Sequence, residues 1–278
     1  MGIQMGALSP HPPIIIPEIG RDEREQVKDT IDSLKELAGE INELDPDLLV
    51  TISPHGPVFR DAISVLGNKE LQGDFSDFGH PNISFRKRNS PEFYQTLRDR
   101  AAEEDIELVV LPSREVQQAN YTAELDHGVL VPLFYLEEVG VDVPLAALTM
   151  GLLPYEELYN FGKIIRNTIN ELEVDAVILA SGDLSHRLKP GAPAGYNPRG
   201  EEFDKKLVDL IAERKFEQIL EIDPSLIKKA GECGLRPLLM MLGAFSGLKV
   251  ETEVKSYEGP FGVGYAVASI YPGRDDNE

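Results

Sequence analysis

The stretch that decides the fold is Leu48-Leu49-Val50-Thr51-Ile52-Ser53-Pro54-His55-Gly56-Pro57. An apolar, β-branched run reaches Ser53, and proline and glycine then end it on both sides of His55. This pattern is typical of a buried strand that delivers an imidazole into the loop at its carboxyl end. Open α/β sheets bind ligands just beyond the carboxyl ends of their strands. The stretch therefore predicts a strand of an α/β sheet, with His55 at a candidate binding site.

Two other stretches repeat this pattern. Gly6-Ala7-Leu8 leads into Ser9-Pro10-His11-Pro12-Pro13, and the apolar run 174–180 leads into Ser181-Gly182-Asp183-Leu184-Ser185-His186. Three of the five histidines therefore follow a candidate strand. The repetition predicts that His11 and His186 lie, like His55, just beyond the carboxyl end of a strand.

The segment 21–44 joins the first two of these candidate strands. Its apolar residues recur every three or four positions and form the stripe of an amphipathic helix: Val27, Ile31, Leu34, Leu37, Ile41 and Leu44. A strand, a helix and a parallel strand make a βαβ unit. We therefore predict that the strands at 3–9 and 48–53 are neighbours, with His11 and His55 at the same edge of the sheet.

The rest of the chain continues the alternation of strands and helices. Further strands are expected at 62–66, 82–87, 106–111, 143–148, 174–181, 250–256 and 262–270, and helices at 91–103, 129–136, 155–172, 201–215, 216–230 and 238–242. The stretch 67–80, which is rich in glycine and acidic residues, is expected to be a loop, as is the polar connector 112–121. The last residues, 274–278, read as a frayed acidic end. The pattern predicts one α/β domain over residues 1–278.

Composition narrows the class of protein. The chain has 278 residues, 42% of them hydrophobic and 27% charged, as in ordinary globular proteins. A net charge of −21 argues against binding to nucleic acid or to an anionic membrane. No apolar run approaches the roughly 20 residues of a membrane span, and no signal peptide is recognisable, so a cytoplasmic protein is expected. The single cysteine, Cys233, cannot form an intrachain disulfide and reads as a small buried residue.

A metal site is one interpretation of these histidines. His11 and His55 end strands that we expect to be neighbours, and Glu232 stands immediately before a helix that is apolar on all sides. A carboxylate in that position needs either the N–H groups of the helix terminus or a metal as its partner. Two histidines and one carboxylate are the ligand set of non-haem Fe(II) enzymes. From the residues alone, the alternative is that each histidine is a hydrogen-bonded loop residue.

Five short motifs resemble those of a known family, in its order: Ser-Pro-His-Pro-Pro at 9–13, Ser-Pro-His-Gly-Pro at 53–57, Leu-Asp-His-Gly at 125–128, Ser-Gly-Asp-Leu-Ser-His at 181–186 and Gly-Glu-Cys-Gly at 231–234. They resemble the motifs of the class III extradiol ring-cleavage dioxygenases. More narrowly, the chain resembles the LigB-type domains associated with AMMECR1 and radical SAM proteins, and the related Memo proteins. The resemblance implies a single-domain α/β fold with a mixed central β-sheet flanked by helices on both faces.

The resemblance also implies roles for individual residues. His11, His55 and Glu232 would be the ligands of Fe(II), or of another divalent metal such as Zn or Mn. His186 would exchange the hydroxyl proton of the substrate, and His127 would position the substrate or stabilise negative charge. Memo-type relatives have a cysteine as the third ligand, and here Cys233 is adjacent to Glu232. For His127, a structural histidine at a helix N-terminus is the alternative, and Asp183 is expected to have a cap or loop role.

Three functions follow from these expectations. The first is an Fe(II)-dependent extradiol dioxygenase that acts on a small aromatic diol, such as a catechol, and O₂. The second is a Memo-like metal-binding partner of AMMECR1-type and radical SAM proteins, without dioxygenase turnover. The third is a divalent-metal hydrolase with His186 as the base. A homo-oligomer is also expected.

Overall fold

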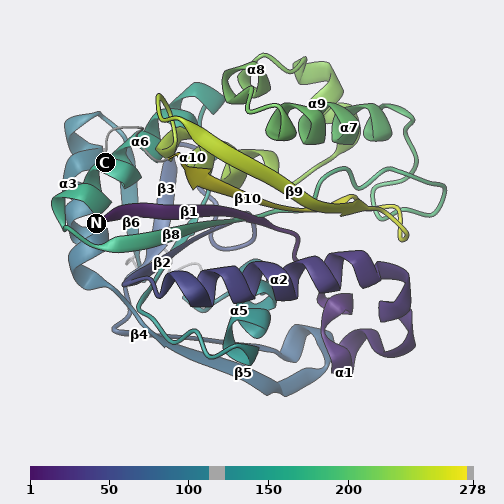
Figure 1. Ribbon diagram of the computed structural model, residues 1–278, viewed down its shortest axis with the longest axis horizontal. Helices are drawn as coiled ribbons and strands as arrows, with labels where there is room; N and C mark the ends of the chain where they lie inside the picture. The colour runs from purple at the N-terminus through teal and green to yellow at the C-terminus, as the bar shows by residue number, and fades with distance from the viewer. Residues whose placement is uncertain (113–122, 274–278) are drawn as a thin grey trace.

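A mixed sheet of eight strands forms the centre of the fold in the computed structural model, which describes residues 1–112 and 123–273 (Figure 1). The strands lie in the order β6 (Glu107–Leu111), β3 (Ala62–Leu66), β7 (Leu145–Thr149), β2 (Leu48–Ser53), β8 (Asp175–Ser181), β1 (Gly2–Ser9), β10 (Tyr265–Pro272) and β9 (Val250–Glu258). β7, β2, β8 and β1 are parallel to one another, whereas β3 and β10 run antiparallel to their neighbours β7 and β1. The expected α/β fold with a mixed central sheet is therefore confirmed. The expectations for the connector 112–121 and for the end 274–278 concern residues outside the described ranges, except Pro112.

Helices cover both faces of this sheet (Figure 1). One face is covered by α2 (Lys28–Leu44), α5 (His127–Glu138), the short α1 (Pro17–Gly20) with the 3₁₀ turns η1 (Pro13–Ile15) and η2 (Arg21–Val27), and a hairpin of β4 (Glu70–Phe75) and β5 (His80–Arg88), with η3 (Ser76–Phe78) between its strands. The other face is covered by α3 (Pro91–Glu103), α6 (Tyr155–Glu171), α7 (Arg199–Ala212), α8 (Phe216–Leu220), α9 (Pro224–Ala230) and α10 (Leu235–Ala244).

The burial of strand β2 on both faces explains why its sequence does not alternate between apolar and polar residues. Leu48, Val50 and Ile52 pack into the core on one face, and Leu49 packs into the core on the other. All six residues of the strand are buried, so the usual alternation of polar and apolar residues is absent. Pro54 then ends the strand and starts the loop that carries His55.

The prediction that the first two strands are neighbours is wrong, because β8 lies between β1 and β2. Ala180 of β8 faces Leu8 on one side and Ile52 on the other, and both pairings are parallel. A right-handed βαβ crossover fixes the direction of the two strands but does not prevent a third strand from pairing between them. The expected common edge is confirmed, since the loops that follow β1, β2 and β8 all leave the same edge of the sheet.

Two other expectations need correction. The stretch 67–80 is not a loop throughout, because β4 and η3 lie within it. Alternate residues of β4 are buried, which is the period of a half-buried strand despite the glycine and the acidic residues. The helix expected at 21–44 is regular only from Lys28, since residues 21–27 form a 3₁₀ turn. Its apolar stripe is buried from Val27 to Ile41, as predicted.

Candidate metal centre

The loops after β1 and β8 are held together by one hydrogen bond to a side chain and one between backbone groups. The N–H of His11 donates to Oδ1 of Asp183 over 2.9 Å, and the N–H of Gly182 donates to the carbonyl of Ser9 over 2.9 Å. The side chain of His11 is buried, with 2% of the residue exposed, and its Nδ1 lies 2.8 Å from Oγ of Ser181. These contacts fix the ring so that Nε2 faces the loop after β2.

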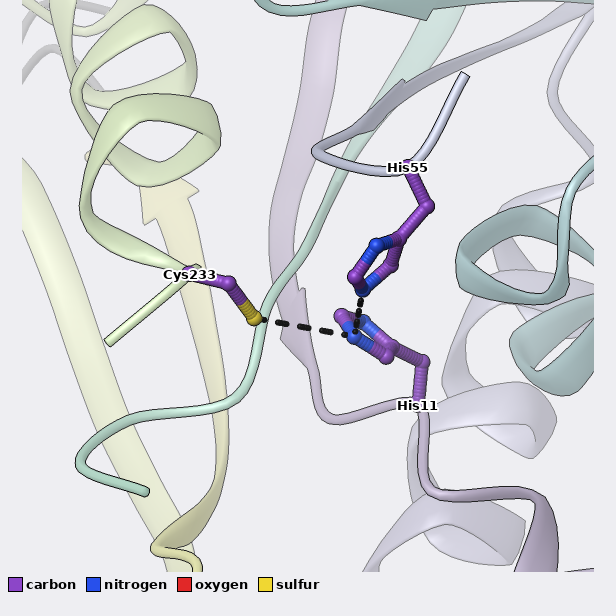
Figure 2. Close-up of side chains that lie close together, drawn as sticks. All are labelled: His11, His55 and Cys233. Atoms are coloured by element: carbon purple, nitrogen blue, oxygen red, sulfur yellow. Dashed lines mark hydrogen bonds between the residues drawn. The ribbon is translucent and has the colours of Figure 1, made fainter. Parts of the chain in front are cut away.

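His55 reaches the same point from the loop after β2. Its Nε2 lies 2.9 Å from Nε2 of His11, and the two rings are nearly perpendicular, with an angle of 86° (Figure 2). The N–H of His55 donates to Oγ of Ser53, which donates in turn to Oδ1 of Asp126 over 2.5 Å. Asp126 is also the N-cap of α5, where it accepts a hydrogen bond from the N–H of Gly128. The loop is thereby attached to the helix that begins at His127.

Cys233, and not Glu232, lies beside the two histidines. Sγ of Cys233 is 3.7 Å from Nε2 of His11, and Figure 2 shows the cysteine and His55 pointing toward that ring. His11, His55 and Cys233 form a group whose candidate ligand atoms all lie within 4.8 Å of one another. The carboxylate of Glu232 instead accepts a hydrogen bond of 2.7 Å from the N–H of Leu235 and so caps the first turn of α10.

Two glycines allow Cys233 to come this close. A Cβ on Gly182 would lie 2.1 Å from Cα of Gly234, a distance that no side chain permits. The backbones of the two loops therefore touch, and the carbonyl of Asp183 accepts hydrogen bonds from the N–H groups of Cys233 and Gly234 over 3.3 and 2.9 Å. Both glycines belong to the motifs found in the sequence, and they hold the cysteine against the loop after β8.

The two histidines predicted to act on the substrate lie at the same edge. The ring of His127 is stacked on that of His55, with centroids 4.2 Å apart and an interplanar angle of 27°. The centroids of His127 and His11 are 5.4 Å apart. His186 is near enough for its charge, when protonated, to lower the pKa values of His11 and His55. Its Nδ1 is buried and has no hydrogen-bond partner among the described residues. We refer to His11, His55, His127 and His186 as the histidine cluster.

Burial and mutual repulsion keep the histidine cluster uncharged. Burial is the first cause of a lowered pKa for each of the four imidazoles, and for His11 and His55 the charges of neighbouring histidines lower it further. The pKa of His55 falls to about 4. At neutral pH these rings therefore have free lone pairs, which is the form that binds a metal. Burial also raises the pKa of the Cys233 thiol.

Buried carboxyl groups surround the cluster. Burial raises the pKa values of Asp183 and Glu232 to about 7, although a hydrogen bond from the backbone N–H of His11 or Leu235 opposes each shift. The pKa of Asp126 is also raised by burial. A divalent cation near these groups would favour their ionised forms.

A cavity of about 410 Å³ opens beside His55 and His127. Its wall is completed by residues of η3 and of the segment before α5, among them Asp77, Phe78 and Glu124. A larger hollow of about 1070 Å³ lies at the opposite edge of the sheet and is lined by none of these histidines. The first cavity is therefore the candidate substrate pocket, because His55 and His127 line it.

The histidine pair and the thiol fit a divalent metal. Two imidazole nitrogens that face each other at 2.9 Å, with a thiol sulfur 3.7 Å from one of them, converge as metal ligands do. Burial makes the Cys233 thiol hard to deprotonate, but coordination to a metal would favour the thiolate. A thiolate is a softer ligand than a carboxylate. A set of two histidines and one cysteine therefore suits Zn or Cu better than the set of two histidines and one carboxylate that is usual for Fe(II).

Comparison with known proteins gives the class of protein. A model of the catalytic LigB subunit of aromatic ring-opening dioxygenases matches residues 5–268. The chain therefore belongs to the LigB family, the dioxygenase superfamily suggested by its motifs. Proteins of this family are metal-dependent, and the group of His11, His55 and Cys233 is the candidate site for the metal.

Two particular relatives have names that do not describe a function. A protein of Clostridium acetobutylicum is 37% identical over 263 residues, which are 95% of this chain and 56% of that protein. The chain thus spans about half the length of this curated relative. The crystal structure of an uncharacterized protein from Escherichia coli K12 has the same fold, with a TM-score of 0.63 and 15% identity, over 96% of this chain and 99% of that one. Within the described ranges, no helix is long and apolar enough to cross a membrane.

The sequence interpretation did not assign roles to several residues that build the site. Ser181 holds the ring of His11, and Ser53 joins the loop of His55 to Asp126. Both serines are the last residues of their strands and lie directly before the candidate site. Asp183 accepts from the backbone of His11, so its expected loop role agrees with this contact.

Proposed function

We propose that the chain is a metal-dependent ring-cleavage dioxygenase that acts on a catecholic substrate, with His11, His55 and Cys233 as the metal ligands. The observation that carries this proposal is the convergence of two Nε2 atoms and one Sγ atom at the carboxyl edge of the sheet. Family membership supports dioxygenase chemistry, and the cavity beside His55 offers a place for a small aromatic ring.

The ligand proposed from the sequence, Glu232, is less well supported. Its carboxylate is used by the N–H of Leu235, whereas Cys233 faces His11. We retain Glu232 as the competing third ligand because its raised pKa shows that its charge is poorly solvated. Exchange of the two would need the first turn of α10 to give up this cap.

A metal at this site would hold the two hydroxyl oxygens of a catechol, lower their pKa values and pass electron density from the ring to O₂. His186 is uncharged at neutral pH and accepts the hydroxyl proton that the substrate gives up on binding. His127, stacked on His55 at the edge of the cavity, orients the ring of the substrate and donates a hydrogen bond to the charge that develops on it.

Metal analysis followed by oxygenation tests this function. Protein purified without chelators is analysed for iron, zinc, manganese and copper, together with His55→Ala, Cys233→Ser and Glu232→Gln. We expect both His55→Ala and Cys233→Ser to lose the metal and Glu232→Gln to retain it. The metal-loaded protein is then mixed anaerobically with catechols and exposed to O₂, and a yellow ring-fission product is expected. Product formation without O₂, or metal retention by His55→Ala, would contradict the proposal.

One observation favours a second candidate. A cysteine in place of the carboxylate ligand is the Memo-type arrangement and makes iron-dependent oxygen chemistry less natural. In this alternative the chain binds a metal and works with AMMECR1-type and radical SAM partners without turnover. Stable metal binding with no O₂ consumption for any catechol would favour it over the dioxygenase.

A further inference from the structure

The cavity beside the histidine cluster is strongly acidic. Four of its lining residues are carboxylic acids: Asp74, Asp77, Glu124 and Asp126. Among its described lining residues there is no lysine or arginine. A cavity with walls of one charge attracts ligands of the opposite charge and repels those of its own. His55 and His127 line this cavity, so it is part of the candidate site. The negative charge of its walls should therefore influence which substrates bind there.

Two of the four carboxylates already have partners among the described residues. Asp126 accepts hydrogen bonds from Ser53 and Gly128, and Asp74 accepts one from the N–H of Ser76. Asp77 and Glu124 make no hydrogen bond or ion pair with any other residue in the described part of the chain. Asp77 is close enough to His127 to oppose the effect of burial on the pKa of that ring. These two carboxylates are therefore available to a ligand that also reaches His127.

An aromatic ring completes this side of the cavity. Phe78 is 38% exposed, and its ring centroid lies 5.4 Å from that of His127, in an edge-to-face arrangement. A partly exposed phenyl ring beside carboxylates is a favourable environment for an ammonium group, because the ring adds a cation–π attraction to the charge attraction. A carboxylate-bearing aromatic would gain neither term and would be repelled.

We propose that the aromatic substrate of this site carries a protonated amine, which Asp77 and Glu124 bind while the ring lies against His127. We call Asp77 and Glu124 the amine-binding wall. This inference rests on the proposed function, because binding the amine there would present the aromatic ring to the metal site for cleavage. The cavity volume of about 410 Å³ suits one small aromatic ring with a short side chain.

The test compares ligands that share a ring and differ in charge. Dopamine, 4-methylcatechol and 3,4-dihydroxybenzoate provide a cationic, a neutral and an anionic catechol, and their affinities for the metal-loaded protein are measured anaerobically by calorimetry. We expect dopamine to bind about 3–10-fold more tightly than 4-methylcatechol at low salt, and 3,4-dihydroxybenzoate to bind most weakly. The preference for dopamine should shrink at 0.5 M salt, because the charges are partly exposed.

Variants assign the preference to the two carboxylates. Asp77→Asn and Glu124→Gln should each reduce the preference for dopamine about 2–3-fold and leave the affinity for 4-methylcatechol unchanged. Glu43→Gln is the matched control, because Glu43 is exposed near the end of α2, at the opposite edge of the sheet. It should change neither affinity.

A ligand without hydroxyl groups separates this inference from the dioxygenase proposal. Phenethylamine cannot chelate a metal, so its binding to the metal-free protein, followed by ligand-observed NMR, reports the amine-binding wall alone. Weakening of this binding by Asp77→Asn would support the inference even if no catechol were cleaved. Equal affinity for the three catechols, or a preference for 3,4-dihydroxybenzoate, would overturn it, even if all three were cleaved.

Discussion

Two groups of ionisable side chains in this molecule have similar geometry but differ in whether they contain a compensating charge. The histidine cluster lies at the carboxyl edge of the sheet. The second group, which we call the lysine cluster, consists of Lys255 on β9 with Glu36, Glu40 and Glu253. The three carboxylates of the lysine cluster converge closely enough to hold a metal ion, as His11, His55 and Cys233 do.

The lysine cluster already contains its cation. The side chain of Lys255 is 1% exposed, and its Nζ lies 2.9, 2.6 and 3.0 Å from oxygens of Glu36, Glu40 and Glu253. Burial alone would lower the pKa of Lys255, but the hydrogen bonds that its ammonium group donates to Glu40, Glu36 and Glu253 outweigh this effect and raise the pKa. The ammonium group therefore occupies the position that a metal would take.

In the described part of the chain, the histidine cluster has no such internal cation. Its four imidazoles repel one another when protonated, and among the described residues no lysine or arginine forms a hydrogen bond or ion pair with them. The comparison teaches that convergence of ligand atoms is insufficient to identify a metal site. The group that lacks a compensating charge of its own is the better candidate.

The largest expected effect comes from removing a ligand of the histidine cluster. His55→Ala should lower Zn²⁺ affinity by more than the 10–100-fold, about 1.4–2.7 kcal/mol, that is typical of losing an outer-shell partner. Competition with a chromophoric chelator measures the affinity. Glu253→Gln in the lysine cluster is the control and should leave the affinity unchanged. An equal loss of Zn²⁺ affinity in both variants would contradict the assignment of the metal to the histidine cluster.

Adding metal should stabilise the protein through the histidine cluster. At a free metal concentration 100 times Kd, binding to the folded state alone adds about 2.7 kcal/mol to the free energy of unfolding. For a chain of 278 residues, that corresponds to a rise in Tm of roughly 5 °C. Scanning calorimetry of chelator-treated protein, with and without Zn²⁺, measures the shift. His55→Ala should abolish it and Lys255→Met should not; a shift that survives His55→Ala would place the metal elsewhere.

Replacing the internal cation should make the lysine cluster depend on an external one. Lys255→Met leaves three carboxylates facing one another and should lower the free energy of unfolding by about 1–2 kcal/mol, a modest cost because Glu36 and Glu253 are largely exposed. Urea denaturation measures this loss. Millimolar Ca²⁺ should restore part of it in Lys255→Met and have no effect on the unsubstituted protein. Stability that is unchanged in Lys255→Met would show that the ammonium group is not needed there.

The smallest effect is the response of the two clusters to pH. The pKa of His55 is about 4 in the folded protein, below the ordinary value of 6.5, so the unfolded chain binds the proton first as pH falls. The free energy of unfolding of the metal-free protein should therefore decrease between pH 6.5 and 4. His55 is partly exposed, which limits its share to on the order of 1 kcal/mol.

Urea denaturation at pH 7.5 and 5.0 checks this dependence. His55→Gln should show a smaller decrease than the unsubstituted protein, because it lacks one of the groups that the unfolded state protonates. Glu43→Gln, an exposed substitution at the opposite edge of the sheet, is the control and should show the unchanged decrease. A decrease that is identical with and without His55 would contradict this assignment.

The parts of the fold that depend on local pattern were predictable from the sequence. The stripe from Val27 to Ile41 is buried, and the helix expected at 91–103 is α3 with the same bounds. The short Ser-Pro-His motifs correctly located the carboxyl edge of the sheet, because proline ends a strand wherever it occurs in such a run. β4 was missed because Gly73 and two acidic residues conceal a half-buried strand.

The arrangement of the site depends on contacts between distant segments and could not be predicted. The insertion of β8 between β1 and β2 is decided by pairing between residues more than 100 positions apart. Glu232 and Cys233 lie in the turn that precedes α10, where the carboxylate of Glu232 faces the N–H of Leu235 and the thiol of Cys233 faces His11. If the chain were shifted by one residue here, the residue that bonds to the helix N-terminus and the residue that faces His11 would change places.

The late position of β8 in the chain has a consequence for biosynthesis. Ribosomes deliver the N-terminal half first, so the two Ser-Pro-His loops exist before the strand that separates and aligns them. Cys233 is made later still. A nascent chain would therefore lack a complete metal site until the segments up to Cys233 have left the exit tunnel, so metal loading would follow the synthesis of all three ligands.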